Sequence, residues 1–283
     1  FSAKTVHGEA MSEAITSTSP AVKGNLMKGK RGLIMGVANN RSIAWGIAKA
    51  CAEQGAELAF TYQGEALQKR VFPLAESVGS KLVLPCDVTD PISMDSVFDR
   101  LSKEWGKIDF FVHAIAYSNK EELDGRYVDT TLENFTASMA ISCYSLAALC
   151  QRAEKLMTDG GSIVTLTYYG SEKVIPHYNV MGVAKAALEA SVRYLAVDLG
   201  GQNIRVNALS AGPMKTLAGA AITGARHIYR HAETAAPLGR NPDTNEVGQS
   251  GLYLISDLSS GVTGEVHFVD GGFNAIAIPR EQS

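Results

Sequence analysis

The chain has 283 residues, of which 46% are hydrophobic and 19% charged, and its formal net charge at pH 7 is −3. This composition is typical of a globular protein, and the length suits one large α/β domain or two small ones. No basic stripe suggests a nucleic-acid partner, and no apolar run reaches the roughly 18 residues that a membrane span needs, so we expect neither partner.

Residues 1–23 are rich in Ser, Thr, Ala and Glu and show no hydrophobic period. We expect this segment to be disordered or left over from an expression vector, with Met11 as a natural start, and we place the folded catalytic domain at residues 24–283. The segment lacks the basic end and apolar stretch of a secretory signal. The four cysteines form no C-x-x-C pair and no cluster with zinc-ligand spacing, which favours reduced thiols, a cytoplasmic protein and no metal site.

From residue 26 onward, short apolar runs alternate with longer amphipathic segments. The predicted strands are 32–37, 57–62, 82–88, 108–115, 161–167, 203–210 and 265–270. The predicted helices are 42–54, 65–78, 92–105, 132–157, the segment from Pro176 to about 199, and 245–256. Pro73 should interrupt or kink the second helix. This alternation, without a linker that divides it, predicts an α/β protein: a single-domain, doubly wound parallel sheet (Rossmann fold) with helices on both faces.

The turn from the first strand into the first helix, residues 36–46, is the candidate phosphate-binding loop. Gly36 would let a pyrophosphate approach the backbone, and the helix N-terminus offers free N–H groups. Ser42, the expected N-cap, adds a hydroxyl donor. The G-x-G-x-x-G fingerprint is absent, with only Gly36 and Gly46 left of a glycine pattern. The position of the loop therefore supports this interpretation, and an ordinary βα turn is the alternative.

The ends of the second, third and fourth strands would lie beside a bound dinucleotide. Gln63 stands where an acidic residue commonly binds the adenosine ribose, and the first cations come a helical turn or more later, which favours NADH over NADPH. Asp87 and Val88 could bracket an adenine, or Asp87 could cap the next turn. Ile115 supplies apolar atoms to the crevice or belongs to the core.

Tyr168, Tyr178 and Lys185 form the most distinctive constellation. Tyr178 and Lys185 are seven residues apart, so in a helix both side chains point from one face. An ammonium near a phenol should favour the phenolate and make the phenol a better proton donor at neutral pH. Taken alone, the spacing could equally be a half-buried ring and a solvated amine.

Four segments carry a resemblance to the short-chain dehydrogenase/reductase superfamily: Gly-Val-Ala…Ser-Ile-Ala at 36–44, the two tyrosines with Lys185, Ser-Ala-Gly-Pro at 210–213 and Val-Asp-Gly-Gly-Phe at 269–273. Within it, residues 26 to about 277 are similar to the enoyl-acyl carrier protein reductases of bacterial type II fatty acid synthesis. Other members have Tyr-x3-Lys and an Asn-Asn-Ala-Gly segment, whereas this chain has Tyr-x6-Lys and His-Ala-Ile-Ala at 113–116.

The resemblance implies an oxidoreductase of lipid metabolism that uses NADH to reduce the carbon–carbon double bond of trans-2-enoyl-acyl carrier protein thioesters, the last reductive step of fatty acid elongation. It implies a cytoplasmic homotetramer. In the catalytic set, Tyr178 donates to the thioester oxygen, Lys185 bonds the nicotinamide ribose and Tyr168 lines the site; Ser118 contacts substrate with both tyrosines. The implied cofactor-binding residues are Gly36, Ser42, Ile43, Gln63, Asp87, Val88, Ile115, Lys185, Met214, Lys215, Thr216, Leu217 and Ala218.

A substrate lid is implied at about residues 214–230, and its Gly/Ala-rich part at 218–225 could equally be a frayed surface helix. Directly after this Gly/Ala-rich part, a cluster of basic side chains could face an acidic carrier protein or simply be solvated: Arg226, His227, Arg230 and His231. Two other functions stay open at this point. One is a short-chain reductase acting on a ketone or alcohol, and the other is a non-catalytic NAD-sensing module.

Overall fold

The computed structural model describes residues 23–220 and 222–278, so the expectations for Met11 and most of the N-terminal segment lie outside it. The strands are β1 (Arg31–Met35), β2 (Glu57–Tyr62), β3 (Leu82–Pro85), β4 (Phe110–His113), β5 (Gly161–Thr167), β6 (Ile204–Ala211) and β7 (Val266–Val269). The α-helices are α1 (Ile43–Glu53), α2 (Gly64–Ser77), α3 (Pro91–Trp105), α4 (Lys120–Leu123), α5 (Leu132–Met139), α6 (Ser145–Ala153), α7 (Asn179–Gly200), α8 (Leu217–Ala220), α9 (Ala225–Ala235) and α10 (Thr244–Ile255).

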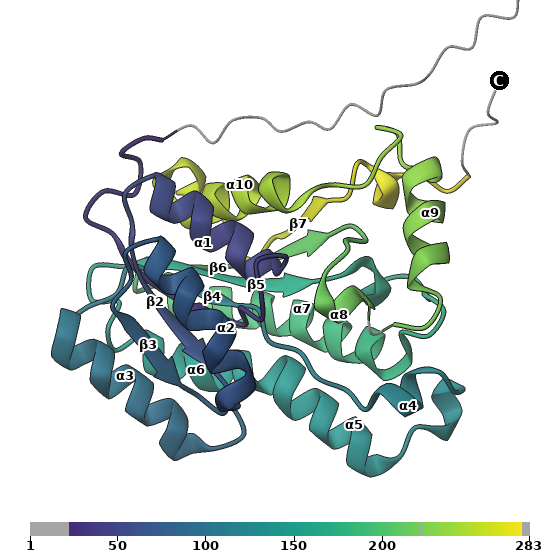
Figure 1. Cartoon of the computed structure of the whole chain (residues 1–283), viewed down its shortest axis with the longest axis horizontal. Coiled ribbons are helices and arrows are strands. Elements are labelled where there is room, and N and C mark those ends of the chain that lie inside the picture. Colours follow the sequence, from purple (N-terminus) through teal and green to yellow (C-terminus); the bar gives the residue numbers. More distant parts are fainter. Residues whose placement is uncertain (1–22, 221, 279–283) are drawn as a thin grey trace, which may run out of the picture.

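The seven strands form one sheet in the order β3-β2-β1-β4-β5-β6-β7, and every neighbouring pair is parallel. The chain leaves β1 toward β2 and β3 and then returns to β4 on its other side, which creates a topological switch point between β1 and β4. Ligands of such sheets bind at the carboxyl ends of the strands near that point. Figure 1 shows the helices on both faces, and the predicted fold class is confirmed.

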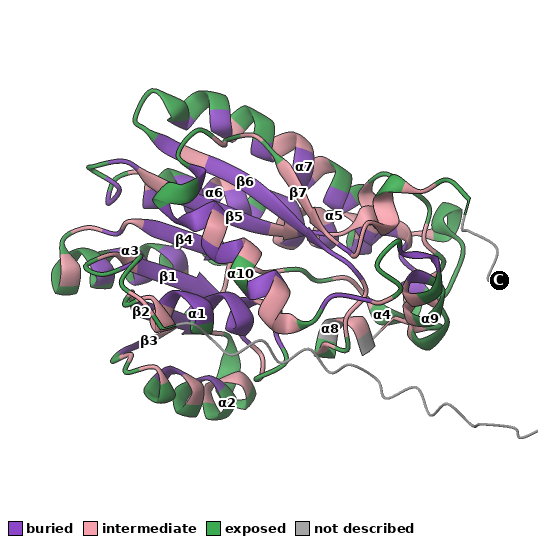
Figure 2. Cartoon of the chain, turned by 90° about the horizontal axis from the view of Figure 1, so that it is seen from above, coloured by how far each residue is buried: buried purple, intermediate pink, exposed green. Residues whose placement is uncertain are grey.

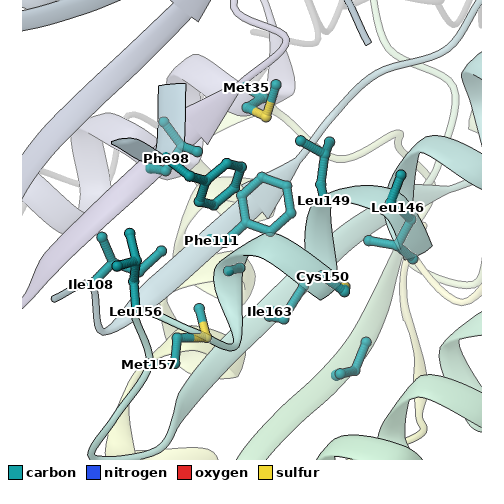
Figure 3. Close-up of a cluster of buried hydrophobic side chains, with 14 of the residues drawn as sticks. Met35, Phe98, Ile108, Phe111, Leu146, Leu149, Cys150, Leu156, Met157 and Ile163 are labelled. Atoms are coloured by element: carbon teal, nitrogen blue, oxygen red, sulfur yellow. The ribbon is translucent and has the colours of Figure 1, made fainter. Parts of the chain in front are cut away.

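Two hydrophobic cores cover the two faces of the sheet because successive strand residues point in opposite directions. Leu33 and Met35 of β1 pack toward α3, α6 and α7, whereas Ile34 between them packs toward α1, α2 and α10. Figure 3 shows the first core, where the fully buried Phe111 of β4 lies beside Phe98 of α3 and among aliphatic side chains of neighbouring elements. The buried strands appear as a purple band between green outer helix faces in Figure 2.

Several predicted boundaries and local features are wrong. The third strand ends at Pro85 rather than 88, and the fourth spans 110–113 rather than 108–115. Helix α2 continues through Pro73, which therefore does not end it. The predicted helix 132–157 contains a π-helical segment, η2 (Ala140–Tyr144), between α5 and α6. Among the helices of the described ranges, none combines the length and apolar character of a membrane span.

Gly46 has a packing role rather than a place in the phosphate loop. It lies inside α1, where a Cβ would stand 2.5 Å from the carbonyl oxygen of Thr244. A Cβ on Gly248 of α10 would in turn stand 2.5 Å from the carbonyl oxygen of Gly46. The two glycines let α1 and α10 approach closely, so the glycine pattern proposed for residues 36–46 reduces to Gly36.

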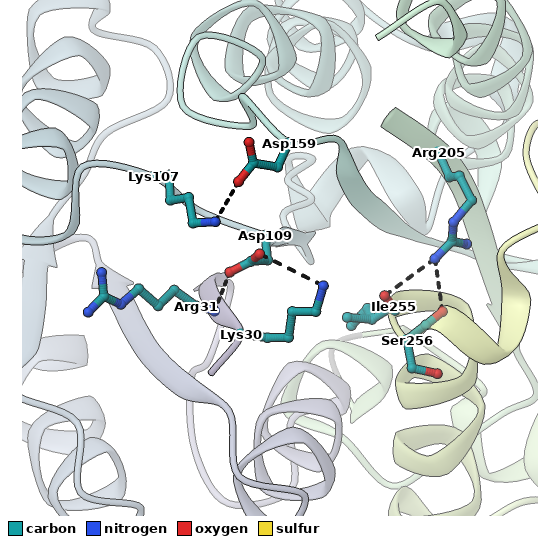
Figure 4. A network of polar contacts seen from close by, with 8 residues as sticks. All are labelled: Lys30, Arg31, Lys107, Asp109, Asp159, Arg205, Ile255 and Ser256. Atoms are coloured by element: carbon teal, nitrogen blue, oxygen red, sulfur yellow. Dashed lines mark hydrogen bonds and ion pairs between the residues drawn. The ribbon is translucent and has the colours of Figure 1, made fainter. Parts of the chain in front are cut away.

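The amino ends of the strands are joined by a polar network on the side away from the switch point (Figure 4). Asp109 accepts from the backbone N–H of Arg31 at 2.8 Å and lies 3.9 Å from the ammonium of Lys30. Lys107 and Asp159 form an ion pair at 2.6 Å. These contacts hold the starts of β1, β4 and β5 in register and leave the carboxyl ends free for a site.

Candidate active site

The β1–α1 turn is built around Gly36, whose φ is +95°. A Cβ here would collide with the carbonyl oxygen of Ala114, which follows β4, so glycine is required where the two strand ends meet. Ser42 occupies the N-cap position of α1, as predicted, but its Oγ accepts from the backbone N–H groups of Ala38 at 3.0 Å and Asn39 at 3.1 Å. The hydroxyl hydrogen of Ser42 and the first N–H groups of α1, which begins at Ile43, are thereby left for an anion.

Gln63 and Asp87, predicted separately, meet at the ends of β2 and β3. The Gln63 Nε2 donates to Asp87 Oδ2 at 2.9 Å. Asp87 Oδ1 accepts from the backbone N–H and hydroxyl of Thr89 at 2.8 and 2.7 Å, and these bonds hold the pKa of Asp87 below its usual value. Asp87 therefore caps the next turn and also places a negative charge beside Gln63. Val88 and Ile115 are half-buried and pack against the core.

The two tyrosines and Lys185 are brought together at the carboxyl end of β5. Tyr178 directly precedes α7, which begins after the predicted start at Pro176, and its side chain is 8% exposed. The rings of Tyr168 and Tyr178 pack edge to face with centroids 5.2 Å apart. Lys185 is 6% exposed, and its Nζ donates to the carbonyl oxygen of Leu166 at 2.7 Å. One of its three donors is thus used, and two are left for other acceptors.

Burial controls the titration of this cluster. It raises the pKa of Tyr178 well above its ordinary value, with smaller contributions from Tyr168 and Glu189. Burial also raises the pKa of Tyr168 to about 12 and lowers the pKa of Lys185 to about 8. The expectation that Lys185 lowers the pKa of Tyr178 is therefore wrong, because desolvation of the phenolate dominates. Tyr178 stays a neutral phenol at neutral pH, and its O–H can donate to a carbonyl oxygen.

Two glycines that the sequence analysis missed make room for the Tyr178 ring. Gly170 lies in the short helix η3 (Tyr169–Ser171), where a Cβ would collide with that ring. On α7, a Cβ on Gly182 would stand 2.7 Å from the carbonyl oxygen of Gly170. The available signal was a glycine inside a helical pattern, which often marks close packing.

A buried polar layer, also missed, lies next to Lys185. The ring nitrogens of His113 pair with the hydroxyls of Thr165 at 2.9 Å and Ser145 at 2.8 Å. Burial lowers the pKa of His113 to about 3, and the charge of Lys185 contributes to this shift. Glu189, one helical turn after Lys185, accepts from the Thr167 hydroxyl at 2.5 Å. Within the described ranges, no group of three or more His, Cys, Asp or Glu side chains is arranged to hold a metal ion.

The substrate side of the crevice is formed by the loop after β4 and by residues 214–230. Ser118 Oγ donates to Asn134 Oδ1 at 3.2 Å. In the second segment, the hydroxyl of Thr216 accepts from the backbone N–H of Gly219 at 2.9 Å. The ammonium of Lys215 lies 4.9 Å from the ring centroid of Tyr229, so residues near the start and the end of the segment are joined.

The remaining predicted lid residues flank these contacts. Met214 packs against the core under α1 and α10, and Leu217 begins α8 with an exposed side chain. The side chain of Ala218 lies outside the described residues. Helix α9 exposes the predicted cations, Arg226, His227, Arg230 and His231. Of the predicted lid, the structure describes residues 214–220, which include α8, and residues 222–230, which include the first half of α9.

A nucleotide-binding sheet with a tyrosine and a lysine at the carboxyl end of β5 defines a reductase of the short-chain dehydrogenase/reductase class. A family model described as "Enoyl-(Acyl carrier protein) reductase" matches residues 36–274. The chain is 64% identical over 253 residues to "Enoyl-[acyl-carrier-protein] reductase [NADH] 1" of Rhizobium meliloti (strain 1021), which covers 89% of this chain and 93% of that relative. The chain belongs to the enoyl-(acyl carrier protein) reductase family.

Solved structures of enoyl-acyl carrier protein reductases support the same family assignment. The reductase of Anaplasma phagocytophilum in complex with NAD superposes with a TM-score of 0.88 at 58% identity, covering 91% of this chain and 98% of that one. The Bacillus cereus enzyme with NADP+ and indole naphthyridinone superposes with a TM-score of 0.88 at 48% identity, covering 90% and 100%. The predictions of the family, of the Rossmann-type fold and of an enzyme are confirmed.

Proposed function

We propose that this protein reduces the carbon–carbon double bond of trans-2-enoyl-acyl carrier protein thioesters with hydride from NADH. The observation that carries this proposal is the buried pair of Tyr178 and Lys185 at the carboxyl end of β5. Tyr178 presents a neutral phenol donor, and Lys185 presents an ammonium with two donors free of Leu166. NADH also appears in the name of the Rhizobium relative.

The residues of the crevice fit a bound dinucleotide. Gly36 admits a pyrophosphate where a Cβ would collide with Ala114, and the N-terminus of α1 supplies N–H donors. Gln63 would bond the adenosine ribose, and the carboxylate of Asp87 at 2.9 Å from its amide disfavours a 2′-phosphate there. Lys185 would bond the nicotinamide ribose. This arrangement supports NADH as the preferred cofactor.

The mechanism assigns charge stabilisation to Tyr178 and Lys185. When bound, NADH supplies the hydride that adds to the β-carbon of the enoyl thioester, and a proton taken up at the α-carbon completes the reduction. As negative charge develops on the thioester oxygen, the Tyr178 hydroxyl donates a hydrogen bond to it, and the nearby ammonium of Lys185 offsets the charge. Loss of one such donor typically costs about two to three orders of magnitude in rate. Tyr168 holds the Tyr178 ring edge to face, and Ser118 lines the path of the substrate.

The test is the oxidation of NADH, followed spectrophotometrically, with crotonyl and acetoacetyl thioesters in parallel. Turnover of the enoyl substrate alone supports the proposal, and turnover of the ketone alone would assign the protein to ordinary short-chain reductases. Tyr178→Phe should retain NADH binding and lose most of the turnover. Wild-type turnover by Tyr178→Phe would contradict the role given to this hydroxyl.

We also propose a homotetramer. Helix α7 exposes apolar side chains along one face, including Tyr194 at 77% and Val197 at 80% exposure, and the exposed Tyr144 lies on the neighbouring η2. Such a face is typical of a surface covered by a second copy. The edge strand β7 is half-buried and offers a second surface. Sedimentation of the wild type and of Tyr194→Glu/Val197→Glu tests this proposal; a monomeric wild type would contradict it.

A cytoplasmic location is proposed from the thiols. Cys51, Cys86, Cys143 and Cys150 are all free and buried, as expected of a protein from a reducing compartment. Fractionation of the producing cells with antibody detection tests the location.

A further inference from the structure

Tyr178 is flanked on both sides by residues in a left-handed backbone conformation. His177 has φ of +61° and Asn179 has φ of +37°. In the described part of the chain, the one other non-glycine residue with positive φ is Asn203, at +59°. L-residues adopt this region rarely, and it persists where surrounding contacts enforce it, often at functional sites. The contacts that hold Asn179 therefore bear on the position of Tyr178.

The side-chain amide of Asn179 binds the C-terminal end of α4. Its Nδ2 lies 2.7 Å from the carbonyl oxygen of Gly125, 3.1 Å from that of Leu123 and 3.4 Å from that of Glu122. Carbonyls at the end of a helix have no partner within the helix, so the amide satisfies acceptors that would otherwise be left to water. Because all three neighbours are acceptors, the NH₂ rather than the oxygen must face them.

The segment 122–125, which is hydrogen-bonded to Asn179, packs against Tyr178 and is connected through α4 to Ser118, the predicted substrate-contacting residue. Leu123 is buried in the same small apolar cluster as Tyr178. At the other end of α4, Asn119 caps the helix by accepting from the N–H of Glu121 at 3.1 Å. Asn134 then accepts from the Asn119 backbone at 2.8 Å and from the hydroxyl of Ser118. Residues 118–125 thus form one hydrogen-bonded segment that runs from Ser118, the predicted substrate contact, to the carbonyl groups bound by Asn179.

We propose that Asn179 is a positioning residue for the reaction: its amide fastens Tyr178 to helix α4 and so fixes the Tyr178 hydroxyl relative to the substrate segment 118–125. The proposal rests on the role given to Tyr178 in the proposed function. Two contacts then hold Tyr178, the ring slot formed by Gly170 and the backbone held by Asn179. A change at Asn179 should therefore lower kcat through the placement of Tyr178, with little effect on the binding of NADH.

Two variants separate the amide from the backbone conformation. Asn179→Gly removes the side chain and adopts positive φ without strain. Asn179→Asp keeps the shape and tolerates positive φ but presents oxygens to three carbonyls. We expect either change to lower kcat with crotonyl thioester by about tenfold, because small misplacements of a catalytic group are costly. Asn203→Gly is the matched control, because Asn203 is also an asparagine with positive φ and lies just before β6. This variant should retain wild-type kcat.

A double-mutant cycle distinguishes positioning from general damage to the fold. In a Tyr178→Phe background no hydroxyl remains to be positioned, so Asn179→Gly or Asn179→Asp should change kcat by less than about twofold. The NADH dissociation constant should stay within about twofold of wild type in every variant. If Asn179→Gly fails to fold, Asn179→Asp supplies the same cycle.

Two results would overturn the positioning role: unchanged kcat in both Asn179 variants, or the same fold loss in the wild-type and Tyr178→Phe backgrounds. Failure of the proposed function looks different. In that case Tyr178→Phe by itself would have the wild-type kcat, so removal of the hydroxyl would have no effect for the double-mutant cycle to compare.

Discussion

The ammonium of Lys185 donates a hydrogen bond to the backbone carbonyl oxygen of Leu166 at 2.7 Å. Leu166 is the penultimate residue of β5, so the sheet itself fixes the Lys185 side chain as it rises from α7. Thr167, the next residue, holds Glu189 one helical turn beyond Lys185. A buried ammonium is costly unless it has partners, and these contacts supply a dipole and a negative charge.

Activity should depend on the charge of Lys185. Burial lowers the pKa of Lys185 to about 8, with Cys143 and Glu189 opposing this shift. The ammonium is therefore present below about pH 8 and lost as pH rises through that value. We expect kcat/KM for NADH, which reports the free enzyme, to fall along an alkaline limb near that pH.

Lys185→Arg supplies the matched test of that limb. A guanidinium stays charged throughout this range, so the variant should be less active overall but should lose the limb. The titratable groups that interact with Lys185, which include His113, Cys143 and Glu189, remain in both proteins. An identical alkaline limb in wild type and Lys185→Arg would show that another group controls it.

His113 should make stability depend on pH in the acidic range. Its ring is fully buried, and burial lowers its pKa to about 3 from an ordinary 6.5. Between pH 6.5 and pH 3 this histidine is protonated in the unfolded chain but neutral in the folded protein. The free energy of unfolding therefore falls as pH falls. The slope from this one group is about 1.4 kcal/mol per pH unit.

Denaturant unfolding of wild type and His113→Gln at several pH values measures this contribution. The carboxylates are common to both proteins, so they cancel in the difference. The stability advantage of wild type should shrink below about pH 6.5 by about 1.4 kcal/mol per pH unit. A difference that stays constant with pH would contradict a neutral, buried His113.

Cofactor preference should respond to Gln63. The Gln63 side chain is uncharged and donates to Asp87 at 2.9 Å, so neither of these two side chains attracts a 2′-phosphate. Gln63→Arg adds a guanidinium suited to phosphate, and KM for NADPH should fall by about tenfold, a gain of about 1.4 kcal/mol. Gln63→Ala removes the amide without adding charge and is the control. Equal NADPH kinetics in the two variants would exclude a charge effect.

The course of the fold was predictable because each buried parallel strand is a short apolar run between amphipathic helices. Strand β5 was predicted at its observed limits, 161–167. The ends of β3 and β4 were not, since Val88 and Ile115 continue the apolar pattern after strand pairing stops. The interruption expected at Pro73 was wrong, since α2 continues through it and buries Val71 and Ala75 on either side.

The site was only partly predictable. Tyr168, Tyr178 and Lys185 could be placed because the spacing resembles a known family and the strand-helix order puts them at one sheet edge. The supporting residues depend on tertiary contacts that leave little local trace. The hydrogen bond from Gln63 to Asp87 joins positions 24 residues apart, and the hydrogen bond from Asn179 to Gly125 joins positions 54 residues apart.

Exposed cations on α9 should bind the carrier protein. Arg226 and Arg230 lie one turn apart on the exposed face of α9, in the last part of the predicted lid. If an acidic carrier protein docks here, Arg226→Glu/Arg230→Glu should raise KM for enoyl-acyl carrier protein by about tenfold, most strongly at low salt. KM for a small uncharged enoyl thioester should not change. Lys81→Glu/Lys103→Glu, just before β3 and in the last turn of α3, makes the same change in net charge, and an equal effect of that variant would place docking elsewhere.

The slot for the Tyr178 ring should tolerate no side chain at Gly170. Gly170 does not need positive φ, so Gly170→Ala can keep its backbone, but the new methyl group must displace the Tyr178 ring. We expect kcat with crotonyl thioester to fall by about tenfold or more, because the hydroxyl moves away from the thioester oxygen. NADH binding should persist, since Lys185 keeps its bond to Leu166. Gly200→Ala, at the end of α7 where a methyl group meets no atom within 4 Å, is the matched control and should be fully active. Full activity of Gly170→Ala would mean that the ring is free to shift without cost, and that the observed edge-to-face packing on Tyr168 does not set the position of the hydroxyl.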